Sequence, residues 1–131
     1  MTTTAAQYAH RVFELWEYQV SHGQLLIRSP KSPATPSDPE QLTNVDLVFL
    51  GVEYLAVPRL FRGLELVSPT HEELGKIELL VGSKIEPTDV RILLSQGRRF
   101  PVVAFYMALS ENDWDIFESP FEFRSHFRGS K

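Results

Sequence analysis

Two stretches of the chain can pair with themselves around a glycine, and this constrains the fold more than any other feature. The first, LWEYQVSHGQLLIRSP, runs from Leu15 to Pro30, with a turn predicted at His22 and Gly23. One face of the resulting hairpin collects apolar and aromatic residues: Trp16, Tyr18, Val20, Leu25 and Ile27. The other face is mostly polar, and there Glu17 lies opposite Arg28. Since a slip of one residue would scramble both faces, the pattern predicts this register.

The second hairpin is VRILLSQGRRFPVVAF, with a predicted turn at Gly97 and Arg98. A glycine in the first turn position suits a type II′ turn, and it would place Ile92 opposite Val103. The run from Phe100 to Leu109 is almost continuously apolar. Such a run is typical of a central strand that is covered on both faces.

Further strands are predicted from apolar runs and from the glycine and proline residues that interrupt them. A strand is predicted from Val45 to Val57, with a bulge or bend at Gly51, and a short strand lies in RGLELV. The segments KIELLV and NDWDIFESP are also predicted to be extended, the latter after a turn at Glu111 and Asn112.

One short helix is predicted near residues 69–74, in SPTHEELGK. Two starts are compatible with the sequence: Ser68 as the cap before Pro69, or Thr70 as the cap with Glu73 three residues later. Gly75 is expected to end this helix.

The segment between the first hairpin and the next strand is rich in proline. Prolines at positions 30, 33, 36 and 39 have the three-residue spacing of a polyproline II helix. The segment is interpreted as a stiffened surface loop over residues 29–43, and the alternative is a proline-rich ligand for an aromatic groove.

These elements together predict a mainly β fold, either an antiparallel β-sandwich or a partly closed β-barrel of about seven to nine strands. Residues 1–131 are expected to form a single domain, since their number is near the usual size of one domain. Residues 1–9 are expected to be flexible.

Composition excludes several classes. The net charge of -4, spread over both halves of the chain, argues against nucleic-acid binding, which needs a basic face. The absence of cysteine excludes disulfides and thiolate metal sites. Neither a secretory signal nor an apolar run long enough to span a membrane is seen, so a cytoplasmic location is expected.

Motifs for catalysis and cofactor binding are absent. The sequence has no G-x-G-x-x-G, no G-x-x-x-x-G-K-[ST] and no G-x-S-x-G. HEELG at 71–75 misses the zinc motif H-E-x-x-H because Gly75 replaces the second histidine. Arg91, Arg98 and Arg99 are interpreted as a solvated turn rather than an anion site. No catalytic residue, metal ligand or cofactor is predicted.

Four polar residues remain as candidates for ligand binding: Asp113, Asp115, His22 and Arg28. Alternation in a strand would place both aspartates on one face, where they could bind a hard cation or act as an acid–base pair. The interpretation favoured here is that Asp113 and Asp115 guard an exposed strand against aggregation. His22 is predicted to serve the turn.

The function expected from these observations is that of a small, soluble, non-enzymatic binding or protein-interaction module. An acidic partner of a basic toxin or nuclease, as in immunity-type proteins, is one concrete form, and a homo-oligomer is compatible with it. The alternative is a small-ligand-binding protein or enzyme with a pocket in a barrel or between two sheets. The expected partner is a protein, not a nucleic acid or a membrane.

Overall fold

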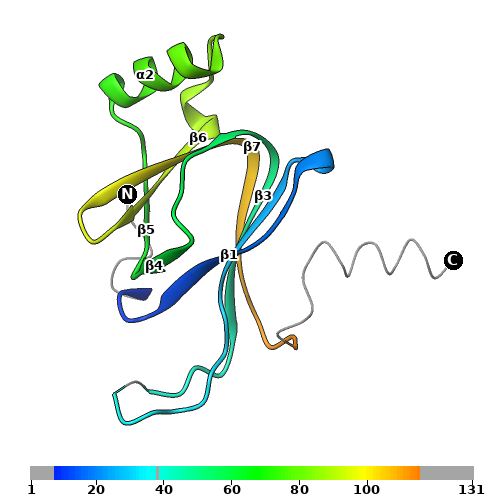
Figure 1. The fold of residues 1–131 in the computed structure, drawn as a ribbon, viewed down its shortest axis with the longest axis vertical. Helices are drawn as coiled ribbons and strands as arrows, with labels where there is room; N and C mark the ends of the chain where they lie inside the picture. Colours follow the sequence, from blue (N-terminus) through cyan, green and yellow to red (C-terminus); the bar gives the residue numbers. More distant parts are fainter. Residues whose placement is uncertain (1–7, 38, 116–131) are drawn as a thin grey trace, which may run out of the picture.

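The computed structural model describes residues 8–37 and 39–115, which form one antiparallel sheet of seven strands with an α-helix packed against it (Figure 1). The strands are β1 (Val12–Gln19), β2 (Gln24–Ser29), β3 (Asn44–Leu55), β4 (Leu60–Arg62), β5 (Glu65–Val67), β6 (Val90–Ser95) and β7 (Arg98–Asn112). The helix is α2 (His71–Val81), and two 3-10 turns are η1 (Val20–His22) and η2 (Pro87–Asp89). No helix in this part of the chain is long and apolar enough to span a membrane.

The sheet curls into an open half-barrel. Its strand order is β4-β1-β2-β3-β7-β6-β5, so that β4 and β5 form the two edges although only Gly63 and Leu64 separate them in the chain. The mainly β prediction is confirmed, with seven strands. A sandwich or a closed barrel is not confirmed, because all strands of the described residues belong to one sheet and β4 does not pair with β5.

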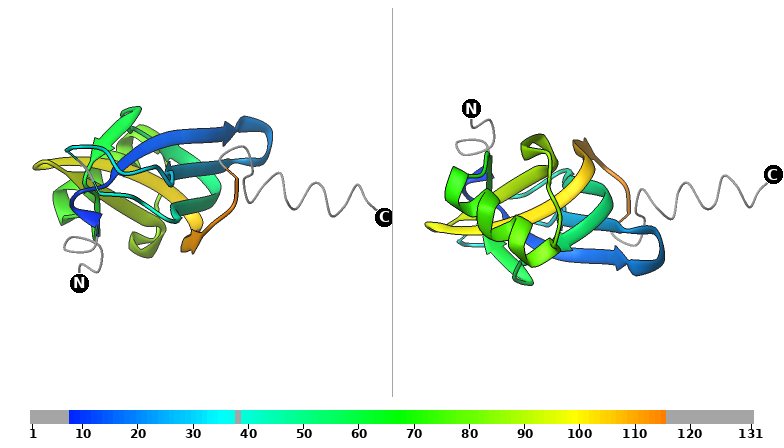
Figure 2. Two further views of the ribbon diagram at one scale, coloured as in Figure 1. Left: turned by 90° about the horizontal axis from the view of Figure 1, so that it is seen from below. Right: turned by 90° about the horizontal axis from the view of Figure 1, so that it is seen from above.

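Two apolar clusters fill the fold. The larger lies inside the curl of the sheet and includes Phe13, Leu25, Ile27, Leu47 and Phe49, all of which are fully or almost fully buried. The smaller lies between α2 and the sheet, where the helix crosses β6 and β7 (Figure 2). It is made of Ile77, Ile85, Val90, Ile92 and Val103, with partly buried neighbours.

The register predicted for the first hairpin is wrong. The chain turns through η1 and then through Gly23 in the left-handed conformation, so that Gln19 pairs with Gln24. A further shift between Leu15 and Glu17 leaves Glu14 opposite Arg28, where Glu17 was expected. Tyr18 and Val20, which belong to the predicted apolar face, are exposed, whereas Leu26, on the predicted polar face, is fully buried.

The second hairpin turns one residue earlier than predicted. Ser95 pairs with Arg98, and the two turn residues are Gln96 and Gly97, both with positive φ. Two positive φ values are the signature of a type I′ turn, so the predicted type II′ turn is wrong. The register shifts by an even number, and Ile92 still shares a face with Val103 although it pairs with Pro101.

The helix α2 is longer than predicted. Thr70 caps it and Glu73 completes a capping box, which selects the second of the two expected starts. Gly75 does not end the helix; it continues through the KIELLV segment, predicted to be extended, to a left-handed cap at Gly82. Packing of Ile77 in the second cluster compensates for the weak helix propensity of Gly75.

The predicted bend at Gly51 is present. Gly51 has a φ of 65°, and the register of β3 against β7 shifts just beyond it, between Val52 and Tyr54. The Phe105 ring of β7 occupies the space where a side chain on residue 51 would stand, 2.2 Å from an ideal Cβ. At the same bend, the Val52 N–H donates to the Gly23 carbonyl at 3.0 Å. The first hairpin is thereby docked onto β3.

The proline-rich segment is a loop, as predicted, and extends from the end of the molecule opposite α2 (Figure 1). One isolated bridge between Ser32 and Gln41 closes its base. The side chains from Pro33 to Ser37 are exposed.

Candidate functional site

A charged pair lies buried on the face of the sheet opposite the larger cluster. Arg28 on β2 is the cross-strand neighbour of Asp46 on β3. Its Nε and Nη2 donate to the two carboxylate oxygens at 2.7 and 2.9 Å, and both side chains are 0 % exposed. This two-point geometry is the favourable one for an arginine and a carboxylate. Arg28 was a ligand-binding candidate, but its guanidinium is occupied by Asp46.

Trp16 covers this pair. The register shift between Leu15 and Glu17 makes Trp16 the extra residue of β1. Its ring stands 5.5 Å from the Arg28 guanidinium carbon, which is within range of a cation–π interaction. The bulge thus places an aromatic ring over a charge that water cannot reach.

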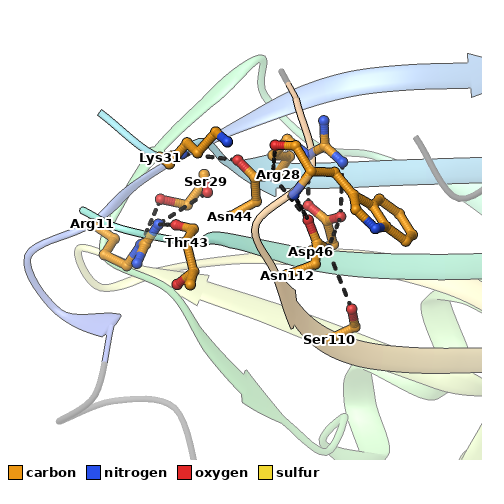
Figure 3. Close-up of polar contacts among 10 residues, drawn as sticks. Arg11, Arg28, Ser29, Lys31, Thr43, Asn44, Asp46, Ser110 and Asn112 are labelled. Carbon is orange, nitrogen blue, oxygen red and sulfur yellow. Dashed lines mark hydrogen bonds and ion pairs between the residues drawn. The ribbon is translucent and has the colours of Figure 1, made fainter. Parts of the chain in front are cut away.

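The same network fastens the end of β7 (Figure 3). Asn112 donates to the second carboxylate oxygen of Asp46 at 2.9 Å and accepts from the Asn44 amide at 2.9 Å. The Asn44 amide also donates to the Trp114 carbonyl at 3.0 Å, and Lys31 Nζ donates to the Asp113 carbonyl at 2.8 Å. After Asn112 the described chain therefore turns back over β3 and β2.

A second polar anchor holds the base of the proline-rich loop. The Arg11 guanidinium donates to the Ser29 hydroxyl at 2.8 Å and to the Thr43 carbonyl at 2.7 Å (Figure 3). It also donates to the Gln41 side chain at 2.9 Å. Burial lowers the pKa of Arg11 from its ordinary value. In the described residues, every buried side-chain nitrogen and oxygen has a hydrogen-bond partner. Both polar clusters therefore serve to join chain segments, and neither leaves an unsatisfied group for a ligand.

The other candidate residues do not meet. His22 is exposed at the turn before β2, while Arg28 lies near the far end of that strand. Asp113 and Asp115 are exposed beyond the end of β7. The turn predicted at Glu111 and Asn112 is absent because β7 runs straight through it, so the two aspartates do not start a new strand; residues 116–120 of that predicted strand lie outside the described residues.

The remaining charged residues of the described structure lie apart or in pairs. Over residues 8–37 and 39–115, no three histidine, aspartate or glutamate residues are grouped as metal ligands would be. Arg99 is paired with Glu73 on α2 at 2.7 Å, and this hydrogen bond lowers the pKa of Glu73 to about 2. Arg98 is exposed, as the interpretation of a solvated turn expected.

Two surface hollows lie at the side of the sheet. One, of about 400 Å³, is lined by residues that include Val67, Pro69, Pro87 and Arg91. The other, of about 380 Å³, lies beside the bend at Gly51 and has Glu53, Asp89 and Phe105 in its wall. None of the four candidate ligand-binding residues lines either of these two hollows.

The feature that the sequence did not predict is an open strand edge. β6 pairs with β7 only as far as Val103, whereas β7 continues to Asn112 along β3. From Ala104 to Asn112, no described strand pairs with the other side of β7. We call this segment the open edge. The prediction that the whole run Phe100–Leu109 is covered on both faces is wrong, because Phe105, Tyr106 and Leu109 are 68, 46 and 41 % exposed.

One signal in the sequence points to this edge. The apolar run that begins at Phe100 is several residues longer than VRILLS, the strand with which it forms the hairpin. A hairpin partner cannot pair beyond its own length, so the remainder of the longer strand needs another neighbour on that side.

Comparison with known proteins gave no identification: no family model, no curated protein and no solved structure matches this chain.

Proposed function

We propose that this chain is a non-enzymatic protein-binding module that recognises its partner by strand addition at the open edge of β7. In strand addition, an extended segment of a partner joins the sheet, and main-chain hydrogen bonds supply much of the affinity. The observation that carries the proposal is the unpaired side of β7 from Ala104 to Asn112 in the described structure.

The composition of this edge supports the proposal. Exposed edge strands are usually protected by lysine, proline, a bulge or inward charge. From Ala104 to Ser110 the edge carries no charged residue and no proline, and its register with β3 is continuous from Tyr106 to Ser110. Three large apolar side chains along it, Phe105, Tyr106 and Leu109, are exposed. Such a surface is a hazard unless something binds to it.

The state of the polar residues also supports a binding module over an enzyme. Arg28 is paired with Asp46, Arg99 with Glu73, and His22 lies far along the hairpin from the aspartates at the end of β7. General acid–base catalysis needs its groups within hydrogen-bond reach of one reacting atom. The described part of the chain offers no such convergence among the predicted candidates.

Selection from a library of random peptides displayed on phage tests this function. Peptides that bind the chain at this edge are expected to bind the Ala108→Val variant equally well and to lose binding to Ala108→Pro, which removes a main-chain N–H from the edge. Selected peptides that bind both variants equally, or a selection that yields no binder, would argue against strand addition.

A further inference from the structure

We infer that the occupant of the open edge is the same edge of a second copy, so that two chains form a two-fold symmetric dimer with one continuous antiparallel sheet. This inference rests on the proposed function, strand addition at β7, and names the partner. Three properties of the edge support this inference: the direction of its main-chain groups, its ability to pair with itself about a two-fold axis, and its lack of charge from Ala104 to Ser110.

The direction of the main-chain groups follows from one hydrogen bond. The Ala56 N–H donates to the Pro101 carbonyl at 3.0 Å, so Pro101 points its carbonyl toward the β3 side. Successive residues of a strand alternate in this direction. The register shift between Val52 and Tyr54 adds its extra residue to β3 and none to β7, so the alternation along β7 is unbroken; the N–H and C=O groups of Tyr106, Ala108 and Ser110 therefore point away from β3 and along the open edge.

Symmetry restricts how two such edges can pair. A two-fold axis perpendicular to the sheet keeps every side chain on its own face, so residues opposite each other must be an even number of positions apart. Placing the axis at Ala108 uses the whole open edge, from Ala104 to Asn112. In this register Tyr106 lies opposite Ser110 of the second copy and Met107 lies opposite Leu109, while Ala108 faces itself.

This register opposes no like charges. The one charged residue of the open edge, Glu111, lies opposite Phe105 of the second copy, which is 68 % exposed in the single chain. The small side chain of Ala108 at the axis allows the two strands to approach, and Met107 against Leu109 is an apolar cross-strand pair. A charged partner segment would find no complementary charge between Ala104 and Ser110, whereas a second copy matches an uncharged edge with an uncharged edge.

The described end of the chain leaves this edge free. Asp113 and Trp114 turn back toward Lys31 on the β2 side and Asn44 on β3, which lie on the other side of β7 from the open edge. The described part of the chain therefore does not fold over its own edge.

Sedimentation velocity of the full chain tests the inference. The wild type is expected to sediment as a dimer at about 100 µM, a concentration at which even a micromolar dissociation constant gives mostly dimer. Ala108→Pro should be a monomer, because it removes one outward N–H at the axis but none of the hydrogen bonds to β3. Ala108→Val keeps that N–H and should remain a dimer. Circular dichroism checks that each variant is folded.

A second pair of variants tests the register and does not depend on proline. Phe105→Glu places a carboxylate opposite Glu111 of the second copy, whereas Phe105→Lys places an ammonium there. The glutamate variant is expected to dissociate about tenfold more readily than the lysine variant, because each dimer contains two such pairs. Equal dissociation constants for the two variants would overturn this register.

The outcomes separate the inference from the proposed function. A wild type that is monomeric at every concentration, or an Ala108→Pro variant that is still dimeric, overturns the second copy as the occupant. If the monomeric wild type nevertheless binds selected peptides that Ala108→Pro rejects, strand addition stands and the partner is a different protein. If neither a dimer nor such peptides are found, both proposals fail.

Discussion

Arg28 and Asp46 illustrate what sequence could and could not predict about single residues. Local pairing within the first hairpin placed Arg28 on a polar face opposite Glu17. In the structure, the bulge at Trp16 changes its β1 neighbour, and its principal partner, Asp46, comes from β3, beyond the proline-rich loop. A contact of that sequence separation cannot be deduced from the periodicity of one hairpin.

The buried pair should show strong coupling. Arg28→Met leaves the Asp46 carboxylate buried without a cation, and Asp46→Asn leaves the guanidinium without an anion; each is expected to cost about 3–5 kcal/mol of unfolding free energy. The double variant removes both charges and should cost clearly less than the sum of the single changes. Urea unfolding of the four proteins measures this, and additive costs would mean that the pair does not act as a unit.

Glu73 should make stability depend on pH. Its pKa lies at about 2 in the folded chain because Arg99 donates to it. A folded-state pKa below the unfolded value stabilises the fold above the unfolded pKa, about 4.3, and this contribution is lost as the pH falls through the folded value.

Glu73→Gln is expected to cost about 1 kcal/mol at neutral pH, since the pair is partly exposed and glutamine can still complete the capping box. The difference from the wild type should shrink below a pH of about 4 and disappear near 2. Glu72→Gln, in the same exposed helical turn, is the control and should show a smaller change. A Glu73→Gln cost that stays constant down to pH 2 would exclude this ion pair as its cause.

At the scale of elements, the sequence predicted which segments are strands better than it predicted their boundaries. Both hairpins form, and the bend at Gly51 and the capping box at Thr70 are where they were expected. The turns were misplaced because several residues around Gly23 and Gly97 can occupy turn positions. The end of α2 was misplaced because tertiary packing of Ile77 overrides the local signal of Gly75.

Two glycines should respond to alanine in opposite ways. Gly75 lies inside α2 with open space around its Cα, so Gly75→Ala should raise the unfolding free energy by about 0.5–1 kcal/mol. Gly51 has a positive φ and the Phe105 ring above it, so Gly51→Ala should lower stability by about 1–3 kcal/mol. Thermal and urea unfolding measure both changes.

Making Gly51→Ala in the Phe105→Ala variant separates the two expected causes of its cost, the positive φ and the contact with the Phe105 ring. Without the ring, Gly51→Ala should cost less, because only the strain of the positive φ remains. An equal cost in both backgrounds would contradict a role of the Phe105 ring, and a loss of stability in Gly75→Ala would contradict a continuous helix through residue 75.

At the scale of the whole molecule, the class of fold was predictable and its closure was not. Alternating runs and turn residues indicate antiparallel strands, but they do not say which strands form the edges. The half-barrel contains a bend of β3 at Gly51, against which the Phe105 ring of β7 packs, and a short link through Gly63 between the two edge strands. The open edge arises because β7 is longer than β6. The long apolar run of β7, considered without comparing its length with that of its hairpin partner, predicted a covered central strand.

Residue-resolved hydrogen exchange of the full chain tests the central claim, the occupation of the β7 edge, most directly. The amides of Tyr106, Ala108 and Ser110 are expected to become protected as the protein concentration rises through the dimer dissociation constant. The amides of Met107 and Leu109, which point toward β3, should be protected at every concentration. Edge amides that exchange freely at all concentrations would contradict occupation by a second copy, and edge amides protected even at the highest dilution would show that the chain covers its own edge.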